Sequence, residues 1–170
     1  MRLALKLHPE SICEAVTGIE VEVAQPGGGR LALLYVVSGR IGDVIIPPRA
    51  PPERTDGLWQ HTCFEAFLGR GEGYVELNFS PSGRWAAYRF DSYRASMAEA
   101  QIGTPEIRTR PGEDIYELEA SLAQPLSGPL QLALSAIIEE SSGRKSYWAL
   151  AHPPGKADFH HPDSFAHRLP

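Results

Sequence analysis

The chain has 170 residues, of which 42% are hydrophobic and 22% are charged, and this length and composition suit one folded domain over residues 1–170 and exclude general disorder. The net charge is −5 and no run of Lys or Arg forms a basic patch, so we expect no nucleic-acid partner. No apolar stretch approaches the roughly 20 residues that span a bilayer, and the first residues alternate instead of forming a leader, so we expect a cytoplasmic protein without a membrane partner.

Alternating apolar and polar residues run through most of the chain, with Gly- and Pro-containing turns between them. This pattern predicts an all-β fold, an antiparallel β-sandwich of the jelly-roll or immunoglobulin-like kind with at most one or two short helices. Only Ser92–Gln101 suits a short helix. The expected strands are Leu3–Leu7, Ile19–Ala24, Arg30–Val37, Asp43–Ile46, Cys63–Leu68, Tyr74–Ser80, Trp85–Asp91, Tyr116–Leu122, Leu130–Glu139 and Ser146–Ala151.

Two long irregular segments, Pro47–Trp59 and His152–Pro170, interrupt the strand pattern. Long loops on a rigid sheet are common places for binding residues. Cys13 and Cys63 are far apart and match no metal-binding spacing, so we expect two reduced thiols.

The strands between Cys63 and Asp91 can be aligned by matching their apolar faces, because a slip of one residue would exchange the two faces. Two-residue turns at Arg70-Gly71 and Ser82-Gly83 complete this alignment. The predicted cross-strand pairs on the polar face are Glu65 with Glu76, Glu76 with Arg89, Asn78 with Ala87, and Ser80 with Trp85.

This alignment predicts a row of charged side chains on one sheet face, beside a shallow groove that binds a small polar molecule. Two neighbouring carboxylates need compensation, which a cation such as Arg89 can supply. The alternative without a binding function is a solvent-exposed sheet face with an ordinary salt bridge. The expected ligand-binding residues are Trp59, His61, Glu65, Glu76, Asn78, Trp85 and Arg89, with His161 contributed by the C-terminal segment.

The sequence is also compatible with other site chemistries. Glu65 and Glu76 resemble the carboxylate pair of a glycoside hydrolase. Histidines and an aspartate gather near the C-terminus without the spacing of a metal motif, so we expect no bound metal. These residues are His152, His160, His161, Asp163 and His167.

Two segments carry a family resemblance, Asp56–Leu68 (DGLWQHTCFEAFL) and Tyr74–Gly83 (YVELNFSPSG). They resemble the DOMON-like superfamily and are similar to family 9 carbohydrate-binding modules. The resemblance implies an antiparallel sandwich that binds sugars in some members and haem in others. It places Trp59, Glu65, Glu76 and Asn78 near the binding face, whereas His61-Thr62 stand where an acidic residue often precedes the strand.

Haem binding would need a Met and a His ligand, and Met97 is the only methionine away from the start of the chain. We therefore expect no cofactor. The sequence favours a binding module for a carbohydrate or similar polar metabolite, with a small glycoside hydrolase, a haem-binding domain and a purely structural domain as alternatives.

Overall fold

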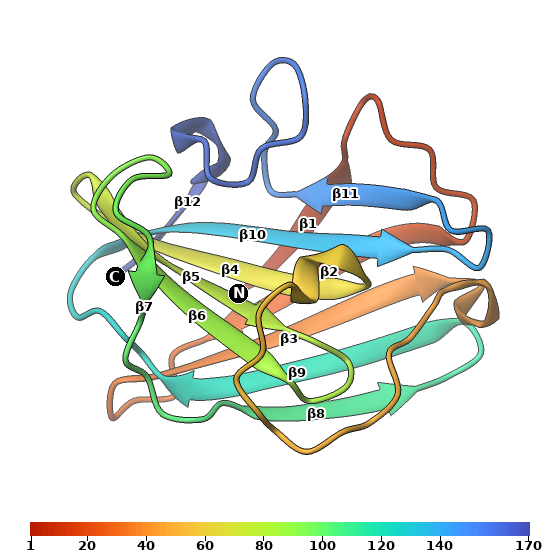
Figure 1. Cartoon of the computed structure of the whole chain (residues 1–170), viewed down its shortest axis with the longest axis horizontal. Coiled ribbons are helices and arrows are strands. Elements are labelled where there is room, and N and C mark those ends of the chain that lie inside the picture. The colour runs from red at the N-terminus through yellow and green to blue at the C-terminus, as the bar shows by residue number, and fades with distance from the viewer.

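The computed structural model describes residues 1–170 and consists of strands joined by turns and loops, without an α-helix (Figure 1). Three short 3-10 segments are the only helical elements, namely η1 (Ile41–Asp43), η2 (Leu58–Gln60) and η3 (Pro162–Ser164). The strands are β1 (Arg2–Leu7), β2 (Val16–Ala24), β3 (Arg30–Gly39), β4 (Cys63–Arg70), β5 (Gly73–Phe79), β6 (Trp85–Phe90), β7 (Ala98–Glu99), β8 (Glu106–Pro111), β9 (Ile115–Ala123), β10 (Leu130–Glu139), β11 (Lys145–Ala149) and β12 (His167–Leu169).

All strand pairs are antiparallel, and eleven strands follow one another in the order β7-β6-β5-β4-β10-β11-β1-β2-β3-β9-β8, while β12 pairs with β10. Strand β1 joins the two layers of the sandwich. Its first part, Arg2–Leu5, pairs with β2, whereas Lys6 and Leu7 pair with β11. We call β7-β6-β5-β4-β10-β11 the cleft sheet and β2-β3-β9-β8 the back sheet. The predicted antiparallel β-sandwich is confirmed.

The core lies between the two sheets because every second side chain of each inner strand points into it. Leu33 and Tyr35 of β3 and Phe64 and Leu77 of the cleft sheet are completely buried. The Tyr35 hydroxyl crosses the interior and donates a hydrogen bond to the Glu65 carbonyl oxygen at 2.7 Å. The apolar alternation therefore holds the two sheets face to face, with one polar link between them.

Several predicted elements differ from the structure. Ser92–Gln101 is not a helix, because Arg94 and Ser96 have positive φ angles of 53° and 56° and only β7 follows them. Asp43–Ile46 is not a strand beyond a single bridge from Val44 to Glu140. Strands β8 and β12 have no counterpart among the expected strands. No helix is long and apolar enough to cross a membrane.

The turn between β4 and β5 shifts the predicted register by two residues. Arg70 pairs with Gly73, so the turn residues are Gly71 and Glu72, and Gly71 adopts the positive φ of 65° that glycine tolerates. A shift of two keeps each side chain on its predicted face. Glu65 and Glu76 therefore share one face, although they are diagonal neighbours and not directly opposite.

The turn between β5 and β6 shifts the register by one, and this prediction was wrong. The Ser80 amide donates to the Arg84 carbonyl at 2.9 Å, which leaves three turn residues in place of the predicted two. Gly83, with φ of 92°, closes this turn. The faces of β6 are consequently exchanged, and Tyr88 lies opposite Glu76 where Arg89 was expected.

Candidate functional site

The outer face of the cleft sheet carries polar and aromatic side chains and is covered in part by loops. A second apolar cluster lies here, outside the main core, with Phe67, Tyr74, Tyr88 and Phe90 among its buried members. Phe159, from the segment after β11, packs against this cluster. In Figure 1 this segment and the loop that carries η2 both lie beside the sheet.

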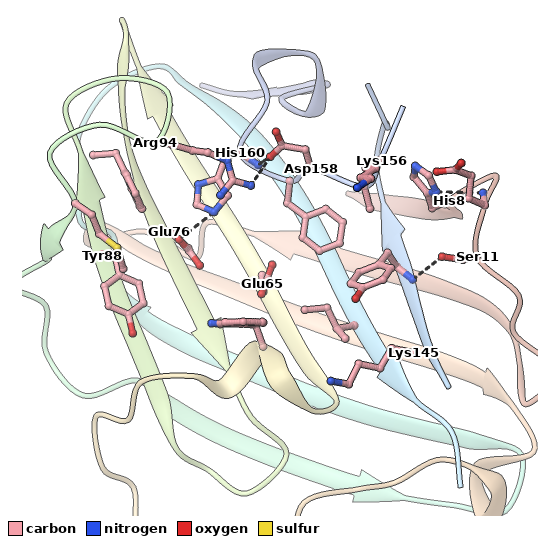
Figure 2. A pocket seen from close by; sticks show the side chains of 18 of the residues that line it. His8, Ser11, Glu65, Glu76, Tyr88, Arg94, Lys145, Lys156, Asp158 and His160 are labelled. Carbon is pink, nitrogen blue, oxygen red and sulfur yellow. Dashed lines mark hydrogen bonds and ion pairs between the residues drawn. The ribbon is translucent and has the colours of Figure 1, made fainter. Parts of the chain in front are cut away.

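A cleft of about 940 Å³ opens on this face. Its floor is formed by side chains from the inner strands, and Figure 2 shows Glu65 near the centre with Tyr88 and Glu76 on one side and Lys145 on the other. The walls come from the segments around Trp59, after β1, after β6 and after β11. A space of this size is typical of a small-molecule site.

Glu65 is buried at the cleft floor, with 3% of its surface exposed. The Ser135 hydroxyl donates to Glu65 Oε2 at 2.9 Å. Burial, and then the nearby Glu76 carboxylate, raise the pKa of Glu65 to about 8, because both disfavour a negative charge on the Glu65 side chain. Glu65 is thus mainly a neutral acid at pH 7, able to donate a hydrogen bond.

Glu76, on the neighbouring strand β5, lies beside Glu65 and is 6% exposed. Asn78 Nδ2 donates to Glu76 Oε1 at 2.9 Å, while His160 Nε2 is 3.6 Å from Glu76 Oε2. Burial raises the pKa of Glu76, and the hydrogen bond from Asn78 opposes that rise. Asn78 Oδ1 is buried without a hydrogen-bond partner.

His160 joins the cleft floor to the C-terminal segment. Its Nδ1 is 2.8 Å from the Tyr74 hydroxyl, and its ring packs edge-on against Phe67 and Phe90. Burial, assisted by the positive charge of Arg94, lowers the pKa of His160 to about 4, so the imidazole is neutral at pH 7.

Asp158 links two of the cleft walls, the loop after β6 and the segment after β11. Arg94 Nη2 donates to Asp158 Oδ1 at 2.8 Å, and the Tyr93 hydroxyl donates to Oδ2. The His160 backbone amide also donates to Asp158 Oδ1, at 3.1 Å. These contacts, part of which Figure 2 draws, link the loop after β6 to the segment after β11.

Aromatic side chains border the polar floor. Trp59 of η2 lines the cleft and is 54% exposed, so much of its indole is free to contact another molecule. Tyr88 lines the same cleft, and its hydroxyl donates to Asp56 Oδ1. Tyr147 and Phe159 lie on the β11 side and contact each other.

Of the eight predicted site residues, four lie together here. Trp59, Glu65 and Glu76 line the cleft, and Asn78 positions the Glu76 carboxylate. The common face of Glu65, Glu76 and Asn78 was predictable because alternation along β4 and β5 sets which side chains point outward.

The other four lie elsewhere. Trp85 faces the core, with the Arg54 guanidinium 4.4 Å from its ring centre, because the three-residue turn exchanged the faces of β6. Arg89 is exposed and its guanidinium is 3.8 Å from the Asp91 carboxylate. His61 binds Glu139 at 2.7 Å, and His161 caps η3 by accepting a hydrogen bond from the Asp163 amide at 3.2 Å.

Other residues line the cleft but were not among the predicted site residues, namely Tyr88, Arg94, Lys145, Lys156, Asp158 and His160. The histidine-rich C-terminal segment was a signal for His160, but no pattern distinguished it from His161. A correct turn length between β5 and β6 would have identified Tyr88.

The histidines and acids form no metal centre, since no group of three or more His, Cys, Asp or Glu side chains is placed to hold an ion. The residues also do not fit haem. Met97 lines the cleft, but the nitrogens of the lining His160 face Tyr74 and Glu76, and those of the lining His8 are hydrogen-bonded to the Gly155 carbonyl and the Glu10 amide. Neither histidine therefore has a free nitrogen for an axial iron ligand.

No family model matches the sequence, and no curated protein matches it significantly. Three solved structures share its fold. A candidate carbohydrate-binding protein from Bacteroides uniformis has 14% identity and a TM-score of 0.68 over 96% of this chain and 83% of that one.

The other two are structures of a family 9 carbohydrate-binding module from Caldicellulosiruptor kristjanssonii. The cellotriose complex has 13% identity and a TM-score of 0.50, over 89% of this chain and 74% of that one. The glucose complex has 15% identity and a TM-score of 0.51, over 96% and 82%. The expected likeness to these modules is confirmed as a likeness of fold.

Proposed function

We propose that this chain is a carbohydrate-binding module and that the cleft over the cleft sheet is its binding site. One observation carries the proposal: a buried pair of carboxyl groups, Glu65 and Glu76, forms the cleft floor below the exposed indole of Trp59. The shared fold with modules solved in complex with cellotriose and glucose supports it.

The floor chemistry suits sugar hydroxyl groups, which both donate and accept hydrogen bonds. Glu65, mainly neutral at pH 7, offers both a donor and acceptors, whereas Glu76, whose pKa is raised by burial, offers only acceptors when it is ionised. Hydrogen bonds that involve an ionised group are stronger and shorter than neutral ones. The pair therefore provides two different partners for neighbouring hydroxyls.

The wall chemistry suits the faces of a sugar ring. A sugar presents C–H groups on its ring faces, and an aromatic side chain offers them a flat apolar surface. The indole of Trp59 is exposed and lines the cleft. The hydrogen bonds to Asp158 hold the segments after β6 and after β11 in place, so the site is largely formed before a ligand binds.

Calorimetric titration with glucose, cellotriose and a panel of other mono- and disaccharides tests the proposal. We expect binding that Glu76→Gln weakens by about tenfold or more, since a charge-assisted hydrogen bond contributes about 1.5–3 kcal/mol. Trp59→Ala should weaken it too without lowering the unfolding temperature. Glu119→Gln and Ile115→Ala, at exposed positions of β9, are the matched controls.

Absence of binding across the panel, or equal binding by both site variants, would reject the proposal. A glycoside hydrolase is the second candidate, because the neutral Glu65 is suited to protonate a leaving group beside the Glu76 carboxylate. Turnover of glycosides by the wild type that Glu65→Gln abolishes would favour that enzyme.

A further inference from the structure

Some of the positively charged groups that line the cleft are in ion pairs, and others are not. Arg94 binds Asp158 at 2.8 Å, and Arg144 lies 3.3 Å from Glu14. Lys145 of β11 and Lys156 of the following segment also line the cleft, and neither is in an ion pair. Figure 2 shows both on the side of the cleft that faces away from Glu76 and Tyr88.

This side of the sheet holds every lysine of the chain. The sequence contains only Lys6, Lys145 and Lys156, in a protein with a net charge of −5. Lys6 is opposite Ala149 in the β1–β11 ladder, so it shares the outer face with Lys145. Lys6 itself does not line the cleft. Two of the three lysines thus line the β11 side of the cleft, and the third lies outside the cleft on the same face.

The nearby acids do not pair with the two lysines of the cleft. Glu65 lies on β4 and is mainly uncharged at pH 7, and Asp158 is already bound to Arg94. Glu76 lies on the opposite side of the cleft, and Glu10, the last acid of the lining, is exposed on the loop after β1. Glu139 is opposite Lys145 in the β10–β11 ladder, but its carboxylate contacts His61 at 2.7 Å. No carboxylate lies within ion-pair distance of Lys145 or Lys156, so both ammonium groups are free to bind a negatively charged group.

We infer that the cleft selects an anionic saccharide, whose negatively charged group lies on the β11 side against Lys145 and Lys156 while its hydroxyls contact Glu65 and Glu76. This inference rests on the proposed carbohydrate-binding function. The charged group is a carboxylate or a sulfate ester, since an ammonium group binds either as a point charge. Selection is by charge on one side of the cleft and by hydroxyl pattern at the floor.

Calorimetric titration in low salt at pH 7 tests the inference with matched ligands. Glucose is compared with glucuronate and with glucose 6-sulfate, and cellotriose with its C6-oxidised, carboxylate-bearing form. We expect the anionic member of each set to bind about tenfold more tightly than the neutral one, as for a charge-assisted contact. Added salt should reduce this preference because it screens exposed charges.

The double substitution of Lys145→Met and Lys156→Met should reduce the preference to less than about twofold and preserve the unfolding temperature. Lys6→Met is the control, as a lysine of the same face outside the cleft. It should retain the preference. Tighter binding of glucuronate than of the 6-sulfate would identify a carboxylate, and the reverse would identify a sulfate.

Equal or tighter binding of the neutral sugars would overturn this inference and leave the proposed function intact. A preference that survives the double substitution, or that Lys6→Met abolishes, would also overturn it. Absence of binding by every saccharide, neutral or anionic, would reject the proposed function itself.

Discussion

Replacing Glu65 with Gln should change how the stability of the protein depends on pH. The pKa of this buried carboxyl is raised from 4.5 to about 8 in the folded state. Between these two values the folded protein holds a proton that the unfolded chain has released. The free energy of unfolding must therefore decrease as the pH rises through this window.

The size of the effect follows from the two pKa values. At pH 6 the folded carboxyl is almost fully protonated and the unfolded one is almost fully ionised, whereas at pH 8 half of the folded groups are ionised. Linkage then makes the wild type less stable at pH 8 than at pH 6 by about 2 kcal/mol from this group alone. Glu65→Gln has no such proton, so it should lack this loss.

Urea unfolding at several pH values between 6 and 8, followed by tryptophan fluorescence, measures the difference. Glu119→Gln, an exposed glutamate of β9, should follow the wild type. The amide of Glu65→Gln can still accept from Ser135, so the variant should fold. Parallel pH curves for wild type and Glu65→Gln would refute the reasoning that burial keeps this carboxyl protonated.

Three further changes have outcomes that the structure predicts. Because burial lowers the pKa of His160 from 6.5 to about 4, the wild type should lose about 2 kcal/mol of stability between pH 7 and pH 4.5, and His160→Gln should remove this loss in urea titrations. Asp158→Ala deletes the contacts that join two cleft walls, so trypsin should cleave after the exposed Lys156 several-fold faster, as peptide mass analysis would show. Tyr35→Phe removes the hydrogen bond to the Glu65 carbonyl and should lower the urea-derived free energy of unfolding by about 1–2 kcal/mol; an unchanged value would mean that this link between the sheets contributes nothing.

The sequence alone determined the fold class and one half of the candidate site. Alternation with a period of two identifies strands and their faces, so the antiparallel sandwich followed from local pattern. The same parity placed Glu65, Glu76 and Asn78 on one outer face even though the turn before β5 was misplaced by one residue. Face assignment tolerates a register shift of two, which is why this part of the prediction held.

The tertiary structure decided the rest. A three-residue turn in place of a two-residue one exchanged the faces of β6, which buried Trp85 in the core and brought Tyr88 beside Glu76. Turn length depends on backbone angles that a short Gly-containing sequence does not specify. The irregular segment after β11 has no period that shows which side chains turn inward. His160 and Lys156 reach the cleft only because this segment packs against the sheet. That packing joins residues far apart in the sequence, so it depends on the complete fold and not on local pattern.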